Sequence, residues 1–508
     1  MENIPVEKNK EYIVDIIDNG FEGEGIAKID GYTIFINGAI KGEKCKIIIV
    51  KVTKSHAYGK IIEIMEKSKH RVEADCTTYK RCGGCNLRHI EYDKTLEMKR
   101  DVVQNLVNKS LANKITVNNT IGMEKPYYYR NKAQYPFGID KNGDKVFGIY
   151  AKRTHEIIEI DDCKIQNPIS AKIAREVLKF VRENNISVYN EETGKGLVRH
   201  LIVKVGIRTN EVMCVIVLNG EKFEKEQELV NLLLEKFNKD DKNEFKIKTI
   251  VKNINTKNTN VILGNKNIVL YGDGYIKDKL GNYTFKISPM SFYQTNPIQT
   301  EVLYNKAIEA AKLKKSDVVL DLYCGIGTIG IYASSFVNKV YGIEIVEQAI
   351  EDAKENARIN NIENIKFRCG AVEDVLEDLI KKENIAPNIV FVDPPRRGLD
   401  KNTVDNILKL KPEKLIYISC NPATMVRDIN MMEAEYMVKE IQPVDMFPLT
   451  RTRGMLCVAR DKERPIILEF TSFQDTIMFN KRSRFGLEKV QNSKINVKVV
   501  LDMECGNI

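Results

Sequence analysis

Short apolar runs alternate with segments of helical periodicity in the second half of the chain. Runs rich in β-branched residues predict buried strands, and apolar residues spaced three or four apart predict helices. Strands are expected from Val318, at Val340–Glu344, near Phe367, from Ile389 and at Leu415–Ile418, with helices at Val346–Asn361 and Val372–Lys382. Because strands that alternate with helices form parallel sheets, residues 281–460 are predicted to form a Rossmann-like α/β domain.

The first 66 residues show a different pattern, in which β-rich stretches are separated by glycines. Tyr12–Ile17, Tyr32–Ile36 and Lys46–Val52 are the predicted strands. Several short strands with glycine turns favour a small OB-like barrel over residues 1–66. Basic residues near its end are Lys51, Lys54, His56 and Lys60. Such a barrel can bind nucleic acid; a barrel that only packs on its neighbours is the alternative.

Residues 93–280 have a mixed pattern that predicts an α+β domain. Leu96–Leu111 is helical in pattern, and a further helix is expected to begin near Pro297. Tyr127–Tyr135 interleaves aromatic with cationic residues, a combination that stacks on bases and contacts phosphates. Gly196–Leu201 is a weaker segment of the same kind. The alternative for both segments is a solvated strand face.

Three cysteines lie close together between these regions, in the pattern Cys76-x5-Cys82-Gly-Gly-Cys85, with His89 shortly after them. In a reducing compartment such a cluster indicates metal binding or catalysis rather than disulfides. Zinc would accept the three thiolates and His89. An iron–sulfur cluster would take a fourth thiolate from elsewhere, and Cys163 is the leading choice. Residues 67–92 are therefore predicted to form a metal-binding segment, with the metal left open.

Another cysteine, Cys420, directly follows the predicted strand Leu415–Ile418 and Ser419. The strand from Ile389 likewise ends in Asp393, followed by two prolines and two arginines. Ligands bind at the carboxyl ends of parallel strands, and a thiol placed there can act as a nucleophile. The two segments together predict one site, although a lone buried cysteine is more often inert.

A glycine turn follows the strand from Val318 and points to a nucleotide-like cofactor. Gly325, Gly327 and Gly330 match GxGxxG, and Glu344 stands about 20 residues on, where an acid can bind ribose hydroxyls. The glycines alone also fit a nicotinamide cofactor. The acidic, proline-rich turn at Asp393 favours a base-modifying methyltransferase instead.

Composition and charge set the broad class of protein. The chain has 508 residues, enough for about two to four domains, with 43% hydrophobic and 29% charged residues, ordinary values for a globular protein. No apolar run approaches the roughly 20 residues of a membrane span, and the N-terminus lacks a signal-peptide pattern. We expect a cytoplasmic monomer. The net charge of +9 permits an RNA partner without requiring one.

Six motifs in chain order resemble those of the RNA 5-methyluridine (uracil-5) methyltransferases, in particular the branch acting on 23S ribosomal RNA. They are the Cys76/Cys82/Cys85/Cys163 set, Phe292–Asn296, Asp321–Gly325, Asp393–Gly398, Ser419–Pro422 and Gln442–Pro448. The resemblance covers about residues 1 to 450. It implies an N-terminal TRAM barrel, a [4Fe–4S] cluster on the four cysteines, a central RNA-binding domain and a C-terminal methyltransferase domain.

The resemblance also implies a role for each site residue. S-adenosyl-L-methionine would contact Gln294, Tyr323, Glu344 and Asp393, and Cys420 matches the nucleophile. A thiolate adding to carbon 6 of uracil makes carbon 5 nucleophilic enough to take a methyl group. Asp393 and Arg397 would hold the base edge and stabilise the charge on its oxygen. Within folded RNA the base must swing out to reach the thiol.

We expect 23S ribosomal RNA to be the substrate, with tRNA as an alternative. The barrel and the cysteine cluster favour ribosomal RNA, since the tRNA branch resembles a shorter form that lacks both. A non-catalytic RNA-binding or assembly factor is an alternative of another class.

The chain departs from the family pattern after Phe447–Thr450. Family members continue with x-His-Val-Glu, whose glutamate is the base that removes the carbon 5 proton, whereas Gly454 stands at that position here. Either an acid elsewhere substitutes, or the reading frame has shifted. One allowed choice of AT-rich codons, read one nucleotide later from Arg451, encodes Glu-His-Val-Glu. The shift would also account for residues after about 450 and the tail 461–508, whose pattern has no place on the predicted fold.

Overall fold

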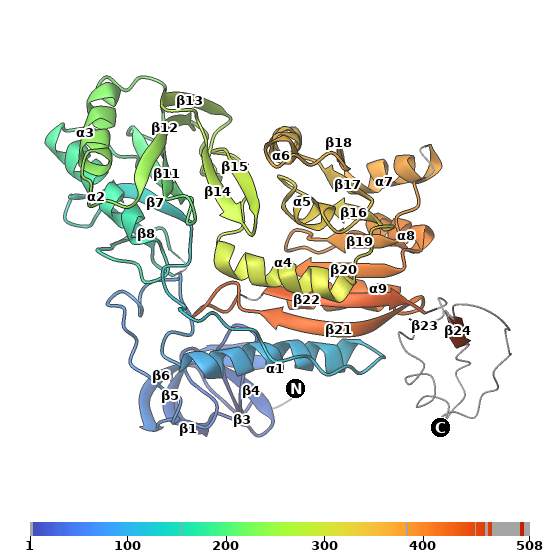
Figure 1. Ribbon diagram of the computed structural model, residues 1–508. Helices are drawn as coiled ribbons and strands as arrows, with labels where there is room; N and C mark the ends of the chain where they lie inside the picture. The colour runs from blue at the N-terminus through green and yellow to red at the C-terminus, as the bar shows by residue number, and fades with distance from the viewer. Residues whose placement is uncertain are drawn as a thin grey trace.

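The structure, a computed structural model, describes residues 4–152, 154–382, 385–452 and 454–462, and the two strands at 466–469 and 498–501. A small β domain lies at the bottom of Figure 1, a central sheet with two helices at the upper left, and a second sheet, covered by helices, at the right. None of the helices in these ranges combines the length and apolarity that a bilayer crossing needs.

Six strands build the N-terminal sheet in the order β1-β5-β6-β4-β3-β2. They are β1 (Glu11–Asp15), β2 (Asp18–Asn19), β3 (Gly25–Ile29), β4 (Tyr32–Ile36), β5 (Lys44–Val52) and β6 (His56–Glu66). Alternate residues of each strand point inward, so that Ile34, Ile47 and Ala57 share one fully buried core. The predicted β-rich N-terminal domain is confirmed.

The central sheet has seven strands in the order β13-β12-β11-β10-β7-β8-β9. Its strands and helices are β7 (Lys132–Ile139), β8 (Lys145–Tyr150), β9 (Ile157–Glu159), α2 (Pro168–Glu183), β10 (Val198–Val205), β11 (Glu211–Leu218), α3 (Glu226–Asn238), β12 (Lys246–Ile254) and β13 (Lys266–Tyr271). Apolar residues of both helices, such as Val177 and Leu233, pack into the core formed with the sheet.

The boundaries of the central domain differ from the predicted range 93–280. Helix α1 (Tyr92–Ser110) packs against α9 (Pro422–Met432) and buries Val103 and Val107 in the core of the C-terminal domain. The hairpin of β14 (Ile276–Leu280) and β15 (Tyr283–Ile287) spans the predicted boundary at residue 280. Helical periodicity shows that α1 has an apolar face, but it does not tell which domain that face covers.

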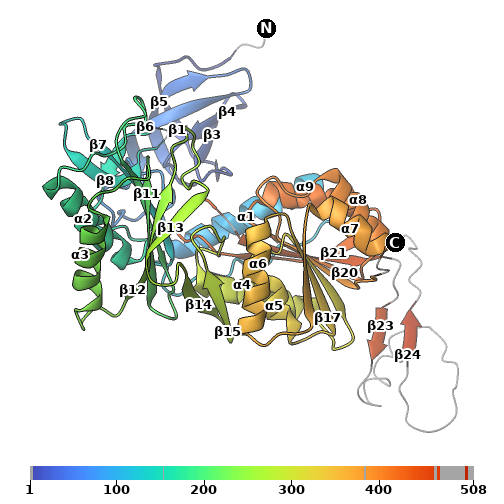
Figure 2. The same ribbon diagram turned by 90° about the horizontal axis from the view of Figure 1, so that it is seen from above.

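The C-terminal sheet has the order β18-β17-β16-β19-β20-β22-β21, with β16 to β20 parallel and β22 antiparallel to both neighbours. Its elements besides α9 are α4 (Pro297–Ala311), β16 (Val318–Leu322), α5 (Thr328–Ser334), β17 (Lys339–Glu344), α6 (Glu347–Ile359), β18 (Ile365–Cys369), α7 (Val372–Lys381), β19 (Ile389–Val392), α8 (Lys401–Leu410), β20 (Lys414–Ser419), β21 (Tyr436–Val444) and β22 (Gly454–Asp461). Helices α4 to α6 cover one face and α7 to α9 the other (Figure 2). The predicted Rossmann-like domain is confirmed, including the helix that begins at Pro297.

One expectation about the end of the chain was wrong. We expected residues after about 450 to have no place on the fold, yet β22 inserts between β20 and β21. Met455, Leu456 and Cys457 are fully buried there, because their apolar run suits an interior strand. Of the predicted tail, 461–508, the structure describes residues 461–462 and the paired strands β23 (Ile466–Glu469) and β24 (Lys498–Leu501); the remainder lies outside the described residues.

Candidate active site

Four neighbouring strands bring the predicted site residues to one edge of the C-terminal sheet. In the order β17-β16-β19-β20, Glu344 ends β17, and Tyr323, Asp393 and Cys420 directly follow β16, β19 and β20. The strands are parallel, so their carboxyl ends lie at the same edge. Residues up to about 100 positions apart in sequence thus meet in one place.

The turn Asp393–Gly398 is fixed against the start of α9. The backbone oxygen of Arg396 accepts from Asn421 Nδ2 at 3.0 Å and from Thr424 Oγ1 at 3.3 Å. The backbone oxygen of Arg397 accepts from Arg427 Nη2 at 2.9 Å. A side chain at Gly398 would collide with α9, since an added Cβ would lie 2.4 Å from Asp428 Oδ2. These contacts decide in which direction each arginine side chain of the turn points.

Cys420 is half-buried, one residue before the N-cap of α9, Asn421. Burial and the carboxylate of Asp393 raise the pKa of its thiol, against the effect of the positive charge of the Arg396 guanidinium. We predicted that Arg397, together with Asp393, holds the base edge and stabilises the charge on its oxygen, and that role stays a prediction. Burial raises the pKa of Tyr323, against the effect of the Arg397 guanidinium, and Arg396 is the arginine that acts on the thiol. The paired arginines were visible in the sequence, but their directions depend on α9.

Asp393 interacts with two site residues: its charge acts on the Cys420 thiol, and its carboxylate accepts a hydrogen bond from Gln294. Gln294 Nε2 donates to Asp393 Oδ2 at 3.2 Å. Asp393 keeps an accessible edge but is surrounded by protein atoms, and this burial raises the pKa of its carboxyl to about 7, against the effect of the Gln294 hydrogen bond. The carboxyl can therefore exchange a proton near neutral pH, next to a thiol.

The glycine turn after β16 leaves open space beside Glu344. Gly325 has a φ of +54°, and no atom lies within 4 Å of where its Cβ would stand. Glu344 Oε2 accepts from the Gly325 N–H at 3.2 Å, and Oε1 accepts from the Val346 N–H at 3.0 Å. Beneath the turn, burial raises the pKa of Asp321 to about 8, and its Oδ2 accepts from the Gly330 N–H at 2.8 Å. An open backbone turn beside a fixed carboxylate suits a cofactor with ribose hydroxyls.

The four predicted metal-ligating cysteines line one cavity of about 220 Å³; they are Cys76, Cys82, Cys85 and Cys163. Burial raises the pKa of the last three, and neighbouring thiols add to the effect. Within the described ranges, no three histidine, cysteine or acidic side chains are close enough to share one metal ion. His89 does not line the cavity; its Nδ1 lies 2.6 Å from the hydroxyl of Tyr79.

The cysteine segment is bonded to the loop that precedes β22. The N–H groups of Asn86 and Leu87 both donate to the backbone oxygen of Leu449, at 3.2 and 3.1 Å. In the same loop, Asp445 forms a fully buried ion pair with Lys99 of α1, at 2.5 Å. Tyr92 donates to the same carboxylate at 2.9 Å. This anchoring could not be predicted from the sequence, because a lysine that becomes buried on a helix cannot be distinguished there from an exposed one.

At the start of β22, neighbouring atoms fill the space that the side chain of the expected proton-removing base would need. Gly454 is buried, and a Cβ added to it would lie 2.2 Å from Cγ of Met446 and 3.1 Å from the backbone oxygen of Val444. The backbone as described therefore has no room for a carboxylate side chain at Gly454.

Comparison with known families identifies the chain. A profile described as tRNA (Uracil-5-)-methyltransferase matches residues 91–458, more than half of the chain, and a TRAM domain profile matches residues 5–62. The chain belongs to the tRNA (uracil-5-)-methyltransferase family. As a member of this family it is an RNA (uracil-5-)-methyltransferase with an N-terminal TRAM domain.

Relatives of the whole chain support this assignment to the uracil-5-methyltransferase family. An uncharacterized RNA methyltransferase of Clostridium acetobutylicum is 46% identical over 451 residues, which cover 88% of this chain and 96% of that protein. An uncharacterized RNA methyltransferase of Staphylococcus aureus is 43% identical, and the match covers 86% of this chain and 94% of that protein.

Among solved structures, the tRNA (uracil-54, C5)-methyltransferase of Pyrococcus abyssi, in complex with S-adenosyl-L-homocysteine, is 28% identical with a TM-score of 0.69. The match covers 88% of this chain and 99% of that one. We had taken the barrel and the cysteine cluster as arguments for ribosomal RNA, because the tRNA branch resembles a shorter form that lacks both. A tRNA enzyme whose structure matches 88% of this chain weakens the argument from the shorter form.

Proposed function

We propose that this enzyme transfers a methyl group from S-adenosyl-L-methionine to carbon 5 of a uridine in 23S ribosomal RNA, through a covalent bond to Cys420. The observation that carries the proposal is the meeting of Cys420, Arg396 and Asp393 at adjacent strand ends, beside the open glycine turn and Glu344. A thiol, a cation and an acid at one point are what addition to a uracil ring requires.

The chemistry follows from the weakness of carbon 5 as a nucleophile. The thiolate of Cys420 adds to carbon 6, and the ring electrons move to make an enolate with carbon 5 nucleophilic. Arg396 stabilises the negative charge of the thiolate. S-adenosyl-L-methionine, when bound, supplies the electrophilic methyl group. Loss of the carbon 5 proton then releases the thiolate and the methylated base.

Glu344, Gln294 and Tyr323 are the residues we assign to cofactor binding. Glu344 has the fixed carboxylate beside open space that ribose hydroxyls need. Gln294 is bonded to Asp393, which follows the strand next to β16 at the same edge of the sheet. The similarity to the Pyrococcus abyssi enzyme, which was solved in complex with S-adenosyl-L-homocysteine, supports the class of cofactor.

The four-cysteine cavity fits a [4Fe–4S] cluster better than a single zinc ion. Zinc needs its ligands gathered within about 2.3 Å of one point, whereas these thiols surround a space of about 220 Å³. Arg88 and Arg130 line the same space, and within the described part of the chain the Nε of Arg130 has no hydrogen-bond partner. Cationic donors suit an anionic, sulfur-ligated group. Such a cluster, when bound, would fix the segment that holds Leu449.

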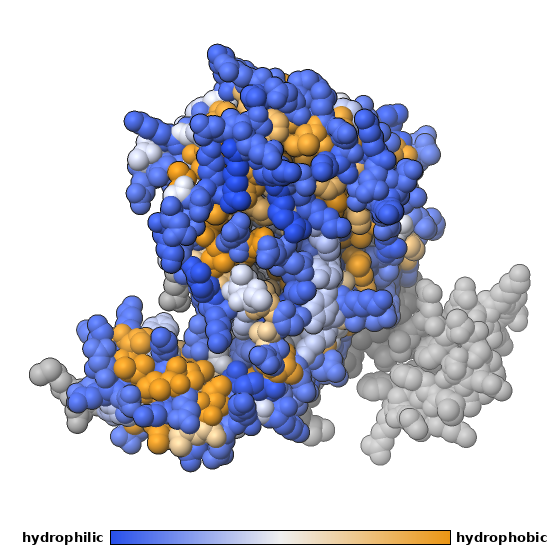
Figure 3. Space-filling model, turned by 90° about the vertical axis from the view of Figure 1, so that its left-hand side faces the viewer, coloured by the Kyte–Doolittle hydropathy of each residue, from blue (hydrophilic) through white to orange (hydrophobic). Residues whose placement is uncertain are grey.

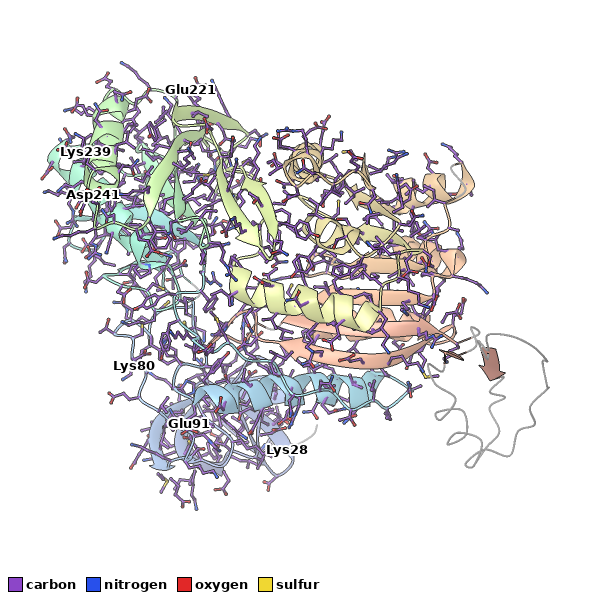
Figure 4. The ribbon with its side chains drawn as sticks, in the orientation of Figure 1. Lys28, Lys80, Glu91, Glu221, Lys239 and Asp241 are labelled. Atoms are coloured by element: carbon purple, nitrogen blue, oxygen red, sulfur yellow. The ribbon has the colours of Figure 1, made fainter. Side chains whose placement is uncertain are left out.

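The barrel offers a surface suited to single-stranded RNA. Across β4, β6 and β5, Phe35 pairs with Tyr58 and Tyr58 with Lys51. The rings of Phe35, His56 and Tyr58 lie 5.1 to 6.0 Å apart, and Figure 3 shows apolar side chains gathered on the lower part of the molecule, where the barrel lies. Lys28 of β3 is exposed (Figure 4), and it pairs with Thr33, which in turn pairs with His56. Aromatic rings with nearby lysines stack bases and attract phosphates.

A shift of reading frame near Arg451 remains our explanation for Gly454. Its motive is the family pattern, which has a glutamate at the position of Gly454, and the codon choice that restores this glutamate in the shifted frame. Sequencing the gene tests it directly. If the shifted codons do not read His-Val-Glu, the explanation is rejected and another base must be sought.

Methyl transfer to purified transcripts tests the proposed function. The enzyme, with S-adenosyl-L-methionine labelled in its methyl group, is incubated with 23S ribosomal RNA or with tRNA, and 5-methyluridine is mapped. We expect label in ribosomal RNA only, and none with Cys420→Ala. Label confined to tRNA would give the substrate suggested by the Pyrococcus abyssi neighbour, and label at an atom other than carbon 5 would overturn the assigned reaction.

A further inference from the structure

The central sheet contains a buried lysine whose purpose the reaction above does not explain. Lys204, on β10, is 6% exposed, and none of the ion pairs in the described ranges includes it. Its Nζ donates to two backbone oxygens, those of Ser288 at 2.8 Å and Ser291 at 2.9 Å. Burying an ammonium group costs free energy unless its protons are hydrogen-bonded. The two hydrogen bonds to backbone carbonyls therefore indicate the role of Lys204.

Both carbonyls belong to the loop 288–296, which carries Gln294. The far end of the loop is held by Asn131, just before β7: its N–H donates to the oxygen of Thr295 and its Nδ2 to the oxygen of Gln294, both at 2.9 Å. Two residues of the central sheet thus fix the loop on either side of the glutamine that bonds Asp393.

The C-terminal domain holds the same loop from the opposite side. Asp352 of α6 accepts from the hydroxyls of Ser291 at 2.6 Å and Ser288 at 3.0 Å. Each serine therefore gives its carbonyl to Lys204 and its hydroxyl to Asp352. The loop is a bridge between the domains, with the cofactor contact at its end.

We propose that Lys204 and Asn131 are positioning residues, which hold the loop 288–296 so that Gln294 meets Asp393 and cofactor binding depends on the central sheet. An ammonium group can donate to two carbonyls at once, and no apolar side chain of that length could satisfy them. The inference rests on the proposed function only through the place of Gln294 at the cofactor.

The charge of Lys204 gives the proposal a distinctive pH dependence. Burial and the neighbouring Lys132 of β7 lower the pKa of Lys204 to about 7, while Asp352 of α6 raises it. Tyr293 also lines the small cavity beside the amine. Below this pKa the ammonium attracts both carbonyls strongly, and above it the neutral amine holds them less well. The contribution of Lys204 to cofactor affinity should therefore fall as pH rises through about 7. Asp393 titrates over the same range, so the pH dependence that Lys204→Met removes is the part due to the lysine.

Calorimetric titration with S-adenosyl-L-homocysteine tests the proposal, on the full chain at about pH 6 and about pH 8. We expect Lys204→Met to weaken binding roughly tenfold at the lower pH, as for the loss of a charged hydrogen bond, and to reduce the pH dependence. Asn131→Ala, a second variant, should weaken binding in the same direction. The matched control is Lys252→Met: Lys252 of β12 is equally buried but bonds to Glu226 and to the Glu221 backbone, away from the loop.

The binding measurements distinguish a positioning role of Lys204 and Asn131 from a general loss of stability. Weaker binding by Lys204→Met and Asn131→Ala but not by Lys252→Met supports the proposal. Equal weakening by both lysine variants would show a general loss of stability, and unchanged binding by Lys204→Met and Asn131→Ala would remove the positioning role; either result overturns the proposal. A wild-type chain that fails to bind S-adenosyl-L-homocysteine would instead contradict the proposed function.

Discussion

The enzyme uses thiols in two regions that differ in what surrounds the sulfur. Cys420 stands alone at a strand end, with Arg396 and the carboxyl of Asp393 beside it. Cys85 faces Cys82 and Cys163 across a cavity, with Arg88 beside it. In both regions burial raises the thiol pKa and an arginine lowers it. The arginine therefore does not distinguish the two regions.

The number of thiols and the presence of an acid distinguish them. A single thiol next to a carboxyl near neutral pKa can gain and lose a covalent bond as protons move. Several thiols around one space can share a metal centre, which removes them from such chemistry. In our proposal the same side chain acts as nucleophile or as ligand according to its neighbours. The following predictions test that division, from the largest expected effect on turnover to the smallest.

The largest effect is expected from Cys420→Ala. Without the thiol the uracil ring cannot be activated, so turnover should fall on the order of 10⁴-fold or more, while binding of S-adenosyl-L-homocysteine stays nearly intact. Single-turnover methylation and calorimetry measure the two quantities. The matched control is Cys369→Ala, which removes an exposed thiol at the end of β18. Comparable turnover by the two variants would take Cys420 out of the mechanism.

The second effect concerns the chain as printed, with Gly454 in place of a base. Losing a general base costs on the order of 10²–10⁴ in rate, so the covalent adduct between Cys420 and RNA should form normally and decay slowly. A gel shift that survives denaturation, followed over time, measures formation and decay. Rapid turnover with no lasting adduct would mean that another group removes the proton.

A moderate effect is expected from Glu344→Ala. Its carboxylate bonds the glycine turn and, in our proposal, the ribose hydroxyls, so its loss should weaken cofactor binding by roughly 1.5–3 kcal/mol and leave turnover at saturating cofactor less affected. Calorimetry of S-adenosyl-L-homocysteine binding decides. Unchanged affinity would argue against the assigned role; Glu347→Ala, just inside α6, serves as the control.

The smallest effect on turnover is expected from Cys163→Ser, although it should remove the cluster. Anaerobically purified protein should hold about four irons, and the variant should hold fewer than about one, with cofactor binding retained. Iron and acid-labile sulfide analysis measures this, with Cys369→Ser as control. One zinc ion and no acid-labile sulfide in the unaltered protein would reject the iron–sulfur cluster. The cavity cysteines would still be metal ligands, so their contrast with Cys420 would stand.

The parts of the fold that follow from local periodicity could be predicted from the sequence. The strands that lead to Glu344, Asp393 and Cys420 were placed correctly, because each is a compact apolar run, and parallel strands bring their ends together. The packing of α1 on the C-terminal domain could not be predicted, since an apolar face on a helix does not show which surface it packs against.

The residues that were missed depend on tertiary geometry. Arg396 acts on the thiol of Cys420, and the backbone of its turn is held by hydrogen bonds from α9 and its N-cap, which the local sequence does not predict. Lys204 and Lys99 are buried, and in a sequence a buried lysine cannot be distinguished from the many exposed ones. Each gains its role from carbonyls or a carboxylate supplied by a segment at least about 84 positions away.

The position of β22 has a consequence for how the enzyme is made. This strand comes last among those of the C-terminal sheet but lies inside it, and β21 pairs with no other strand of that sheet. During synthesis the barrel and the cysteine segment emerge early, whereas β20 keeps an open edge and β21 has no partner until Gly454–Asp461 has been translated. A chain cut short between Val444 and Gly454 would carry the proposed nucleophile, the proposed cofactor residues and all four cysteines of the cavity. It would still leave β20 with an open edge and β21 without a partner in the sheet, and the cell would have to recognise it as incomplete.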